Sequence, residues 1–332
     1  MTLEEVARLA GVSTATVSRV INNRGPVRES TRRRVLEAAR RLRYQPNLHA
    51  RTLAGGKSRM IGMVASNIDN PFFIDIFRSF ETEAARHGYE VVLKHSDYSR
   101  KRLLGVIETL VGQRAAGLLI AVAEADESVV EELRESKLPV VFCDGGWASE
   151  RMSAIKVRYA TGMQRVVEHL YGLGHRRFAF LGHHLGLAAA RERERAFTEA
   201  AELHSADVRY VIEEGDDSPD GGRQALQQVL RSGLAPTAVV CANDFMAIGV
   251  LTELRSHGLS APDDVSVAGF DNIEFSRHVY PALTTVSVPR DRMARLAAFA
   301  LIPQESGHPK GREVVIDPEL IVRESTGPAR PG

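Results

Sequence analysis

The sequence has few cysteines and no long apolar run. Its 332 residues include two cysteines, Cys143 and Cys241, each inside an apolar run that is typical of a strand. We therefore expect buried thiols rather than a disulfide or a metal pair. No apolar run approaches the roughly 18 residues that a membrane-spanning helix needs. The beginning of the chain does not have the basic and then apolar segments of a secretion signal, so we expect a cytoplasmic protein with no membrane partner.

Sequence motifs of common enzymes are also absent. The chain has no GxSxG, GxGxxG or HExxH, and no spacing of Cys and His suits zinc. His183 and His184 are adjacent, so they cannot face one ion as two histidines four residues apart on a helix can, and we expect them in a surface turn. The sequence favours a protein that is not an enzyme and has no metal site and no cofactor.

Charge is distributed unevenly along the chain. Residues 1–59 carry 13 Lys/Arg and 4 Asp/Glu, a net charge of +9, whereas the remainder carries 30 and 38, a net charge of −8. Basic residues confined to one small unit are typical of nucleic-acid binding, because Lys and Arg release counterions from phosphates. A solvated charged helix is the alternative for the run RRRVLEAARRLR taken alone.

Three amphipathic segments predict a small helical core in this basic region. The first helix ends at Gly11, Ser13 is a good N-cap for the second, and the third runs from about Glu29 to Arg43. The residues at core spacing are Leu3, Val6, Leu9, Ala10, Val17, Val20, Ile21, Val35, Leu36, Ala39 and Leu42.

The second helix has the outer face that a DNA-recognition helix needs. Thr14, Ala15, Ser18 and Arg19 lie opposite its core residues. In the major groove, small side chains allow close approach, and Arg can make a bidentate contact with guanine. Helix-turn-helix geometry also occurs in proteins that do not bind DNA, so the basic charge is what favours DNA here.

These residues resemble the LacI/GalR family of transcriptional regulators. The resemblance rests on LEEVARLAGVSTATVSRVIN and VRESTRRRVLEAARRLRYQPNLHARTLAGGKSRMIG, and it continues through nearly the whole chain. It implies a hinge helix from Asn47 to Ala54 that orders on operator DNA, with Leu53 as an apolar wedge that parts a base step in the minor groove. The DNA-binding residues expected from this resemblance are Ser13, Thr14, Ala15, Thr16, Ser18, Arg19, Asn22, Asn47, His49, Ala50, Arg51 and Leu53.

From Met60 onward, short apolar runs alternate with amphipathic segments. The runs are MIGMVAS, YEVVLKHS, GLLIAV, PVVFCD, RFAFLG, RYVIEEG, AVVCAN and VSVAGF. This alternation predicts parallel sheets covered by helices. Because eight or more strands exceed one comfortable sheet, we expect two doubly wound lobes with a ligand cleft at the carboxyl ends of the strands. The resemblance likewise implies a body similar to a periplasmic sugar-binding protein.

Polar and aromatic side chains follow several of these runs, where α/β ligand sites form. Carboxylates, amides and an arginine can pair with neighbouring hydroxyls, while aromatic faces cover an apolar ring face, so the set suits a sugar or sugar derivative. Helix capping is the alternative reading of such Asp and Asn residues, and we expect it for Asp244. The effector-binding residues expected from the strand ends are Asn70, Phe72, Phe73, Asp97, Asp144, Trp147, Asn243 and Asp271. The family resemblance implies Arg193 as a further one.

The sequence thus predicts an α/β protein with an all-α head and a periplasmic-binding-protein-like body. The expected function is a repressor that binds a palindromic operator as a homodimer, since no leucine heptad tail is present, under control of a sugar-type effector. A solute-binding protein, the first alternative, would carry a signal sequence and no basic head. A sugar-modifying enzyme, the second, would have a nucleophile or an acid–base pair in the cleft and would stay active without residues 1–59. The expected boundaries are 1–45 for the helix-turn-helix, 46–59 for the hinge and linker, and 60–332 for the body, with one lobe at about 60–158 plus 288–318 and the other at about 159–287 plus 319–327.

Overall fold

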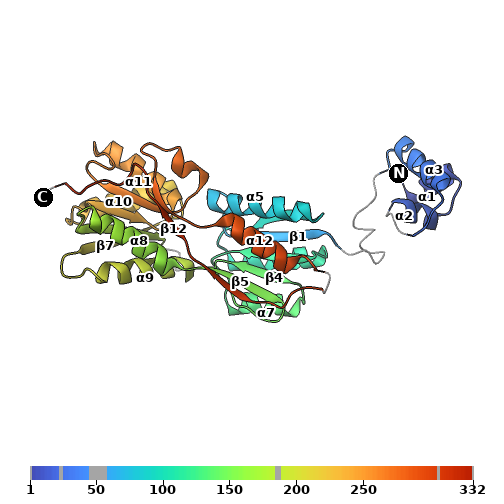
Figure 1. Cartoon of the computed structure of the whole chain (residues 1–332), viewed down its shortest axis with the longest axis horizontal. Helices are drawn as coiled ribbons and strands as arrows, with labels where there is room; N and C mark the ends of the chain where they lie inside the picture. The colour runs from blue at the N-terminus through green and yellow to red at the C-terminus, as the bar shows by residue number, and fades with distance from the viewer. Residues whose placement is uncertain (1, 22–24, 45–57, 184–187, 305–306, 331–332) are drawn as a thin grey trace. The chain divides into compact units, whose positions relative to one another are not determined.

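The computed structural model describes residues 2–21, 25–44, 58–183, 188–304 and 307–330. The chain divides into two compact units, Met1–Ser58 and Arg59–Gly332 (Figure 1). Six of the expected DNA-binding residues lie outside the described residues: Asn22, Asn47, His49, Ala50, Arg51 and Leu53.

The first unit contains three short helices with clear sequence causes. Helix α1 (Leu3–Ala10) begins with a capping box between Thr2 and Glu5 and ends at Gly11, whose φ of 61° suits glycine. Ser13 caps α2 (Thr14–Ile21), because its hydroxyl accepts a hydrogen bond from the backbone N–H of Thr16 at 3.2 Å. Helix α3 spans Glu29–Arg41. These three helices confirm the predicted helix-turn-helix arrangement.

Two leucines of this unit were wrongly expected in its core. Leu9 is 46% exposed and Leu36 is 39% exposed. The buried face of α3 is turned toward Ala38 instead, and α1 likewise buries Ala7. Small alanine side chains let short helices approach closely, so the face with the larger residues need not be the buried one. The buried core consists of Val6, Ala7, Ala10, Val17, Val20, Val35, Ala38 and Ala39.

The second unit is built on two six-stranded sheets, as the fold-class prediction requires. In the first sheet the strand order is β11-β5-β4-β3-β1-β2, and all its pairs are parallel. Its strands are β1 (Met60–Ala65), β2 (Glu90–His95), β3 (Gly117–Ala121), β4 (Val140–Cys143), β5 (Met152–Val157) and β11 (Glu313–Ile316).

The second sheet has the order β12-β10-β9-β8-β6-β7. It departs from the parallel pattern at its edge, where β12 pairs antiparallel with β10. Its strands are β6 (Arg177–His183), β7 (Arg209–Gly215), β8 (Ala238–Cys241), β9 (Ser266–Asp271), β10 (Thr284–Ser287) and β12 (Glu319–Ile321).

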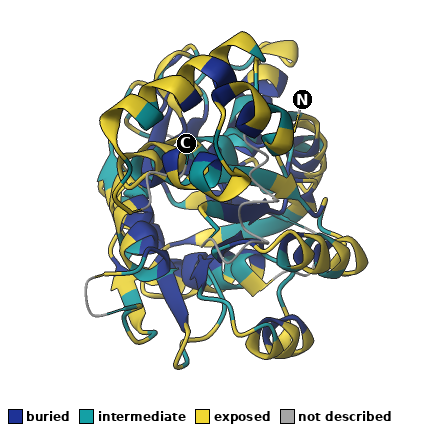
Figure 2. Ribbon diagram, turned by 90° about the vertical axis from the view of Figure 1, so that its right-hand side faces the viewer, coloured by how far each residue is buried: buried dark blue, intermediate teal, exposed yellow. Residues whose placement is uncertain are grey.

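Helices cover both faces of each sheet, so the strands lie in the interior (Figure 2). In β3, Leu119 packs in the core shared with α5 (Pro71–Arg86) and α12 (Arg290–Leu301), while Leu118 and Ile120 join the core of α6 (Arg100–Gly112) and α7 (Glu127–Glu135). This alternation follows from the two-residue period of a strand. The second sheet carries α8 (Tyr159–Gly172), α9 (Ala188–Glu202), α10 (Pro219–Arg231) and α11 (Asp244–Ser256).

The chain crosses between the two sheets three times through short links. One crossing leads from β5 into α8, one from β10 into α12, and one from β11 into β12. The first and third links are tied together by an ion pair of 2.6 Å between Arg158 and Asp317. At the second, Ser287 of β10 pairs with Glu319 of β12. The three crossings therefore lie side by side.

No helix in the described part of the chain is long and apolar enough to cross a membrane.

Close packing of α10 on α11 depends on a glycine. A Cβ at Gly249 would lie 1.8 Å from the backbone oxygen of Pro219, so Gly249→Ala forces the two helix backbones apart. We expect it to lower the free energy of unfolding by about 1–3 kcal/mol. The control is Gly105→Ala in α6, where nothing lies within 4 Å and the gain in helix propensity makes the change neutral or stabilising. Urea unfolding of both variants checks this, and equal destabilisation would contradict it.

Candidate functional site

The exposed face of α2 presents the side chains expected to meet DNA. Thr14, Ala15 and Arg19 are exposed, and Thr16 and Ser18 are half-buried. Val17 and Val20, which are buried, hold the opposite face of the helix against the rest of the unit. The described residues of the predicted recognition surface thus lie on one accessible side of a short helix.

A polar cavity lies in the second unit at the carboxyl ends of strands from both sheets. Its volume is about 50 Å³, whereas pockets for drug-sized ligands measure about 300–1,000 Å³. The side chains that line the cavity therefore fill most of the site, and a sugar-sized molecule would need the sheets to separate or side chains to turn away. Seven of the nine expected effector-binding residues line it: Asn70, Phe72, Phe73, Asp144, Arg193, Asn243 and Asp271.

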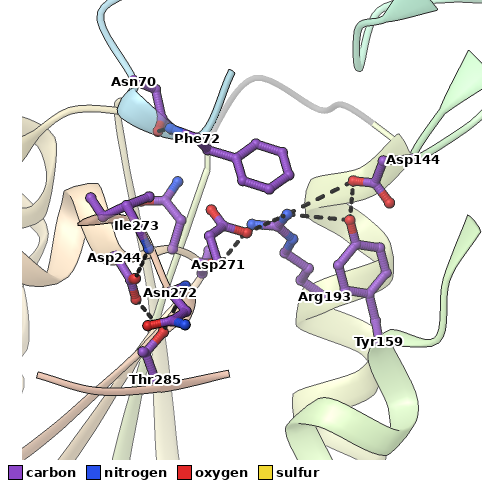
Figure 3. A network of polar contacts seen from close by, with 12 residues as sticks. Asn70, Phe72, Asp144, Tyr159, Arg193, Asp244, Asp271, Asn272, Ile273 and Thr285 are labelled. Carbon is purple, nitrogen blue, oxygen red and sulfur yellow. Dashed lines mark hydrogen bonds and ion pairs between the residues drawn. The ribbon is translucent and has the colours of Figure 1, made fainter. Parts of the chain in front are cut away.

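Arg193 of α9 connects groups from both sheets (Figure 3). Its Nη2 donates to Asp271 Oδ1 at 3.3 Å and to the hydroxyl of Tyr159 at 3.2 Å, and it lies 3.8 Å from Asp144 Oδ2. The Tyr159 hydroxyl in turn donates to Asp144, which follows β4 of the first sheet. Nη1 donates to the backbone oxygen of Ala242 at 2.7 Å. A single buried cation thus holds two carboxylates, one from each sheet.

Burial shapes the protonation of this group of residues. Burial raises the pKa of Asp271 to about 7, and the charge of Arg193 only partly offsets that rise. Burial raises the pKa of Asp144 as well, and the charge of Arg193 again opposes that rise. Burial opposes the charge on Arg193 itself, but its acidic neighbours outweigh that effect and keep its pKa above the usual value. Both carboxyls are therefore harder to ionise in the folded protein than in water.

A second polar cluster surrounds Asp217, which comes two residues after β7 and is buried. Asn70 Nδ2 donates to both of its carboxylate oxygens, at 3.0 and 3.1 Å, and Asn243 Nδ2 donates at 2.6 Å. The hydroxyl of Tyr98 donates to Oδ2, and burial beside this carboxylate raises the pKa of Tyr98, so the hydroxyl stays protonated. Since Asn70 and Tyr98 belong to the first sheet's half, this cluster also links the two halves.

The two asparagines are fixed by the helices that they begin. Asn70 is the N-cap of α5, where its side-chain oxygen accepts from the backbone N–H of Phe72 at 3.0 Å. Asn243 caps α11 in the same way, accepting from Met246 at 2.8 Å. Each amide therefore has its oxygen on the helix and its Nδ2 free to reach the cavity, so capping and binding do not compete.

Asp244, expected as a helix cap, has another role. It is fully buried, and its Oδ2 accepts from the backbone N–H of Ile273 at 2.9 Å while Oδ1 accepts from the hydroxyl of Thr285. Burial raises its pKa well above the usual range. It joins α11 to β10 and to the segment after β9 (Figure 3). The cap of α11 is Asn243.

Two expected effector-binding residues do not line the cavity. The side chain of Asp97 is 68% exposed and lies 3.7 Å from Arg102. Trp147, in the loop after β4, is 50% exposed. Asp97 and Tyr98 have adjacent positive φ angles of 56° and 55°, and this turn places Tyr98, rather than Asp97, at the cavity. We remove Asp97 and Trp147 from the proposed site.

Four residues of the site were missed from the sequence: Tyr98, Tyr159, His183 and Asp217. His183 was wrongly expected in a surface turn. It is the last residue of β6, its side chain is 10% exposed, and its Nε2 lies 3.0 Å from Asn243 Nδ2. The rule that sites form after strands, applied to the run that ends at Gly215, would have found Asp217.

Arg290 fixes the backbone beneath Asp271. At the start of α12, its guanidinium donates to the backbone oxygens of Asp271 and, at 2.7 Å, Asn272. The same group lies 3.8 Å from the carboxylate of Asp75 on α5. A cavity carboxylate in one half is thereby tied through one arginine to a helix of the other half.

The described part of the chain holds no group of three or more His, Cys, Asp or Glu side chains placed to share a metal ion. Cys143 and Cys241 are both buried and free. Burial raises the pKa of Cys143 to about 12, so this cavity residue is a thiol rather than a nucleophilic thiolate at neutral pH.

The first unit has a helix-turn-helix, and the second has two sheets around a cavity with polar side chains. This combination is typical of DNA-binding regulators that carry a ligand-binding domain. Comparison with known proteins gives the family. Residues 2–47 match "Bacterial regulatory proteins, lacI family", and residues 167–326 match a "Periplasmic binding protein-like domain".

Curated relatives and solved structures agree with these matches. The chain is 33% identical over 329 residues to the HTH-type transcriptional repressor PurR of Mannheimia succiniciproducens, covering 98% of both chains, and 34% identical over 326 residues to that of Vibrio campbellii, covering 97% of both. It is similar to the lac repressor dimer bound to operator and the anti-inducer ONPF, with a TM-score of 0.84, 30% identity and coverage of 98% of this chain and 99% of that one. A CelR–cellobiose complex is similar with a TM-score of 0.71, 29% identity and the same coverage.

The chain therefore belongs to the lacI family of bacterial regulatory proteins. It is a DNA-binding transcriptional regulator of that family, and the resemblance found in its sequence is confirmed.

Replacing Arg193 should expose the cost of the buried carboxylates. Folding raises the pKa of Asp271 from 3.8 to about 7, so stability falls as the pH rises through that interval, because Asp271 ionises there in the unfolded chain but keeps its proton in the folded protein. Without Arg193 the pKa rises further, and the loss continues above pH 7. We expect Arg193→Met to lower the free energy of unfolding by about 3–5 kcal/mol at about pH 8, and by less at about pH 5.5.

The matched control is Arg195→Met on the same helix. The Arg195 side chain is 57% exposed and pairs with Glu192 and Glu199 on the surface, so its loss should cost at most about 1 kcal/mol at either pH. Urea unfolding at the two pH values checks both variants. A loss in Arg193→Met that does not depend on pH would contradict the pairing with Asp271 and Asp144.

Proposed function

We propose that this protein is a repressor that binds a palindromic operator as a homodimer and is controlled by a sugar or sugar derivative in the polar cavity. The observation that carries the proposal is that the cavity's polar lining is drawn from both sheets. A ligand there touches both halves of the body, so it can bind their two arrangements with different affinity. That difference is the thermodynamic requirement for control by a small molecule.

The proposed division of labour keeps the boundaries expected from the sequence. Residues 1–45 read the DNA, 46–59 form the hinge and linker, and 60–332 bind effector and dimerise. One lobe at about 60–158 plus 288–318 and another at about 159–287 plus 319–327 are supported by the membership of the two sheets, in which β11 joins the first and β12 the second. Because its target is operator DNA, we place the protein in the cytoplasm.

On the DNA side, we propose that Thr14, Ala15 and Arg19 read base edges, with Ser13, Thr16 and Ser18 on the same helix end. Their exposure on α2 supports this assignment. The hinge residues Asn47, His49, Ala50 and Arg51, the wedge Leu53 and the recognition-helix residue Asn22 lie outside the described residues and remain part of the proposal through the sequence resemblance. Two heads on a dimer would read two half-sites, which is why the operator is expected to be a palindrome.

On the effector side, the proposed binding residues are grouped by chemistry. Asp144, Asp271 and Arg193 offer paired acceptors and a planar donor to ring hydroxyls, and Phe72 and Phe73 offer aromatic faces. Ala189 and Ala190 of α9 give the cavity an apolar wall. The similar CelR structure is a complex with cellobiose, which supports a sugar-type ligand for this cavity. Asn70 and Asn243 complete the proposed set.

The relatives favour a regulator over an enzyme. The curated relatives are named as transcriptional repressors. A transporter's solute-binding protein shares the two-sheet body but does not account for the helix-turn-helix unit. We therefore propose no catalytic role.

Selection from a random-duplex library, with and without a mixed pool of neutral and amino sugars, tests this proposal. We expect a palindrome to be recovered, with a flexible central step, and its enrichment to change when the sugars are added. The sign of that change distinguishes an inducer from a corepressor. Recovery of a single half-site would contradict the homodimer. Enrichment that sugars do not alter would contradict the sugar effector.

Arg19→Ala tests the assignment of the recognition helix. Loss of a bidentate contact with guanine should cost about 1–3 kcal/mol at one position of each half-site and relax specificity there. The control is Arg33→Ala on α3, an exposed arginine that pairs with Glu29 at 3.6 Å; it should weaken binding to all sequences equally or leave it unchanged. Affinities for single-base operator variants measure both effects. Uniform weakening by Arg19→Ala would show a phosphate contact instead.

A further inference from the structure

The charges around the cavity do not balance. Its described lining contains three carboxylates, from Asp144, Asp217 and Asp271, and a single arginine or lysine, Arg193. Arg193 is committed to two of the three, because it lies 3.3 Å from Asp271 and 3.8 Å from Asp144. Asp217 has no Arg or Lys within 4 Å among the described residues, and its nearest ionisable nitrogen is His183 Nε2 at 3.9 Å.

Asp217 is buried all the same, with 3% of its side chain exposed. Burying a carboxylate is costly unless it is paired or fully hydrogen-bonded. In the absence of ligand, neutral donors meet that need: the amides of Asn70 and Asn243 and the hydroxyl of Tyr98. The proximity of Asp217 also helps to raise the pKa of Asp271, which indicates a negative field across the cavity.

Two of these donors, Asn70 and Tyr98, would move away from Asp217 if the two sheets separated to admit a ligand. Asn70 begins α5 and Tyr98 follows β2, so both belong to the half with the first sheet, whereas Asp217 follows β7 of the second sheet. Separation of the sheets to admit a ligand would leave Asn243 as the one donor of these three that still reaches Asp217. A ligand that takes the vacated positions must supply donors to a carboxylate, and an ammonium group carries three donors together with the missing charge.

Arg193, on the other side of the cavity, needs a hydrogen-bond acceptor, whereas Asp217 needs donors. Arg193 is 7% exposed, and its Nε has no hydrogen-bond partner among the described residues. An N–H in that situation needs an acceptor such as a hydroxyl or ring oxygen. The aromatic rings of Phe72 and Phe73 line the same cavity and can cover an apolar face.

We propose that the effector carries a positive charge, as an amino sugar or a similar polyhydroxylated amine does, and that Asp217 binds its ammonium group while Arg193 binds an oxygen. This inference rests on the proposed sugar-controlled function and narrows its ligand class. The alternative is that Asp217 serves solely to hold the two halves together. That role would make no distinction between an ammonium and a hydroxyl at the same position of a ligand.

Matched pairs of sugars separate these readings. The probes are D-glucosamine and D-glucose, D-galactosamine and D-galactose, and D-mannosamine and D-mannose, in which an ammonium replaces one hydroxyl. Calorimetry on the full chain, at a pH where the amine is protonated, should give at least one amino sugar an affinity about tenfold or more above that of its neutral partner.

Variants assign the preference to one carboxylate. Asp217→Asn, which keeps the shape and removes the charge, should abolish the preference, and Asp217→Glu should retain part of it. The control is Asp97→Asn, an exposed acid next to Tyr98 that does not line the cavity; it should leave the preference unchanged. Thermal unfolding of each variant shows whether it is folded, and the wild-type comparison stands without them.

Three outcomes overturn the inference. Neutral sugars that bind as well as their amino partners would remove the ammonium and leave the proposed sugar-controlled function intact. A preference that persists in folded Asp217→Asn would remove Asp217 from the role. Failure of every sugar, charged or neutral, to bind would overturn the proposed sugar effector together with this inference.

Discussion

The body of this protein depends on one buried guanidinium. Arg193 enters the interface between the two sheets from α9 and meets Asp271 on its own half and Asp144 on the other. A buried charge is stable only when it is paired, so the position of this arginine fixes where the two strand ends must lie. The aromatic rings of Tyr159 and Phe270 stand 4.8 and 5.0 Å from its Cζ and complete its surroundings. The residues that form the site are therefore also the residues that hold the two halves together.

The polar contacts between the two halves also explain how a regulator can respond to a small molecule. The polar groups of the cavity bond to one another across the two halves, as Asn70 does with Asp217 and Tyr159 with Asp144. A ligand has to replace these contacts with its own, so its binding energy is coupled to the arrangement of the halves. A ligand that replaced them equally well in every arrangement would bind without shifting any equilibrium.

Sequence patterns predict the strands and helices whose apolar residues recur at regular spacing. They do not predict which of two neighbouring residues is the buried one. All eight apolar runs became strands. Six of them are buried almost throughout, and the other two, β2 and β7, are partly exposed edge strands. The strands β10, β11 and β12 have three or four residues each, too few for a period to be visible. In α3, Ala38 rather than Leu36 is buried, because tight helix packing outweighed side-chain hydrophobicity. Most cavity residues could be found from strand ends, but which of two residues in a tight turn faces inward is decided by backbone angles that composition does not encode.

The three neighbouring crossings between the sheets determine the kind of motion that the body can make. Chains that pass between two rigid layers at neighbouring points, with links as short as the one between Ile316 and Glu319, permit rotation about the line through them and resist translation. The cavity is at the carboxyl ends of the strands, while the chain enters the first sheet at the amino end of β1, at Met60. In such a rotation, points far from the line through the crossings are displaced more than points close to it. A rotation about that line would therefore move the amino end of β1, from which the chain leads back to the helix-turn-helix unit, together with the cavity wall.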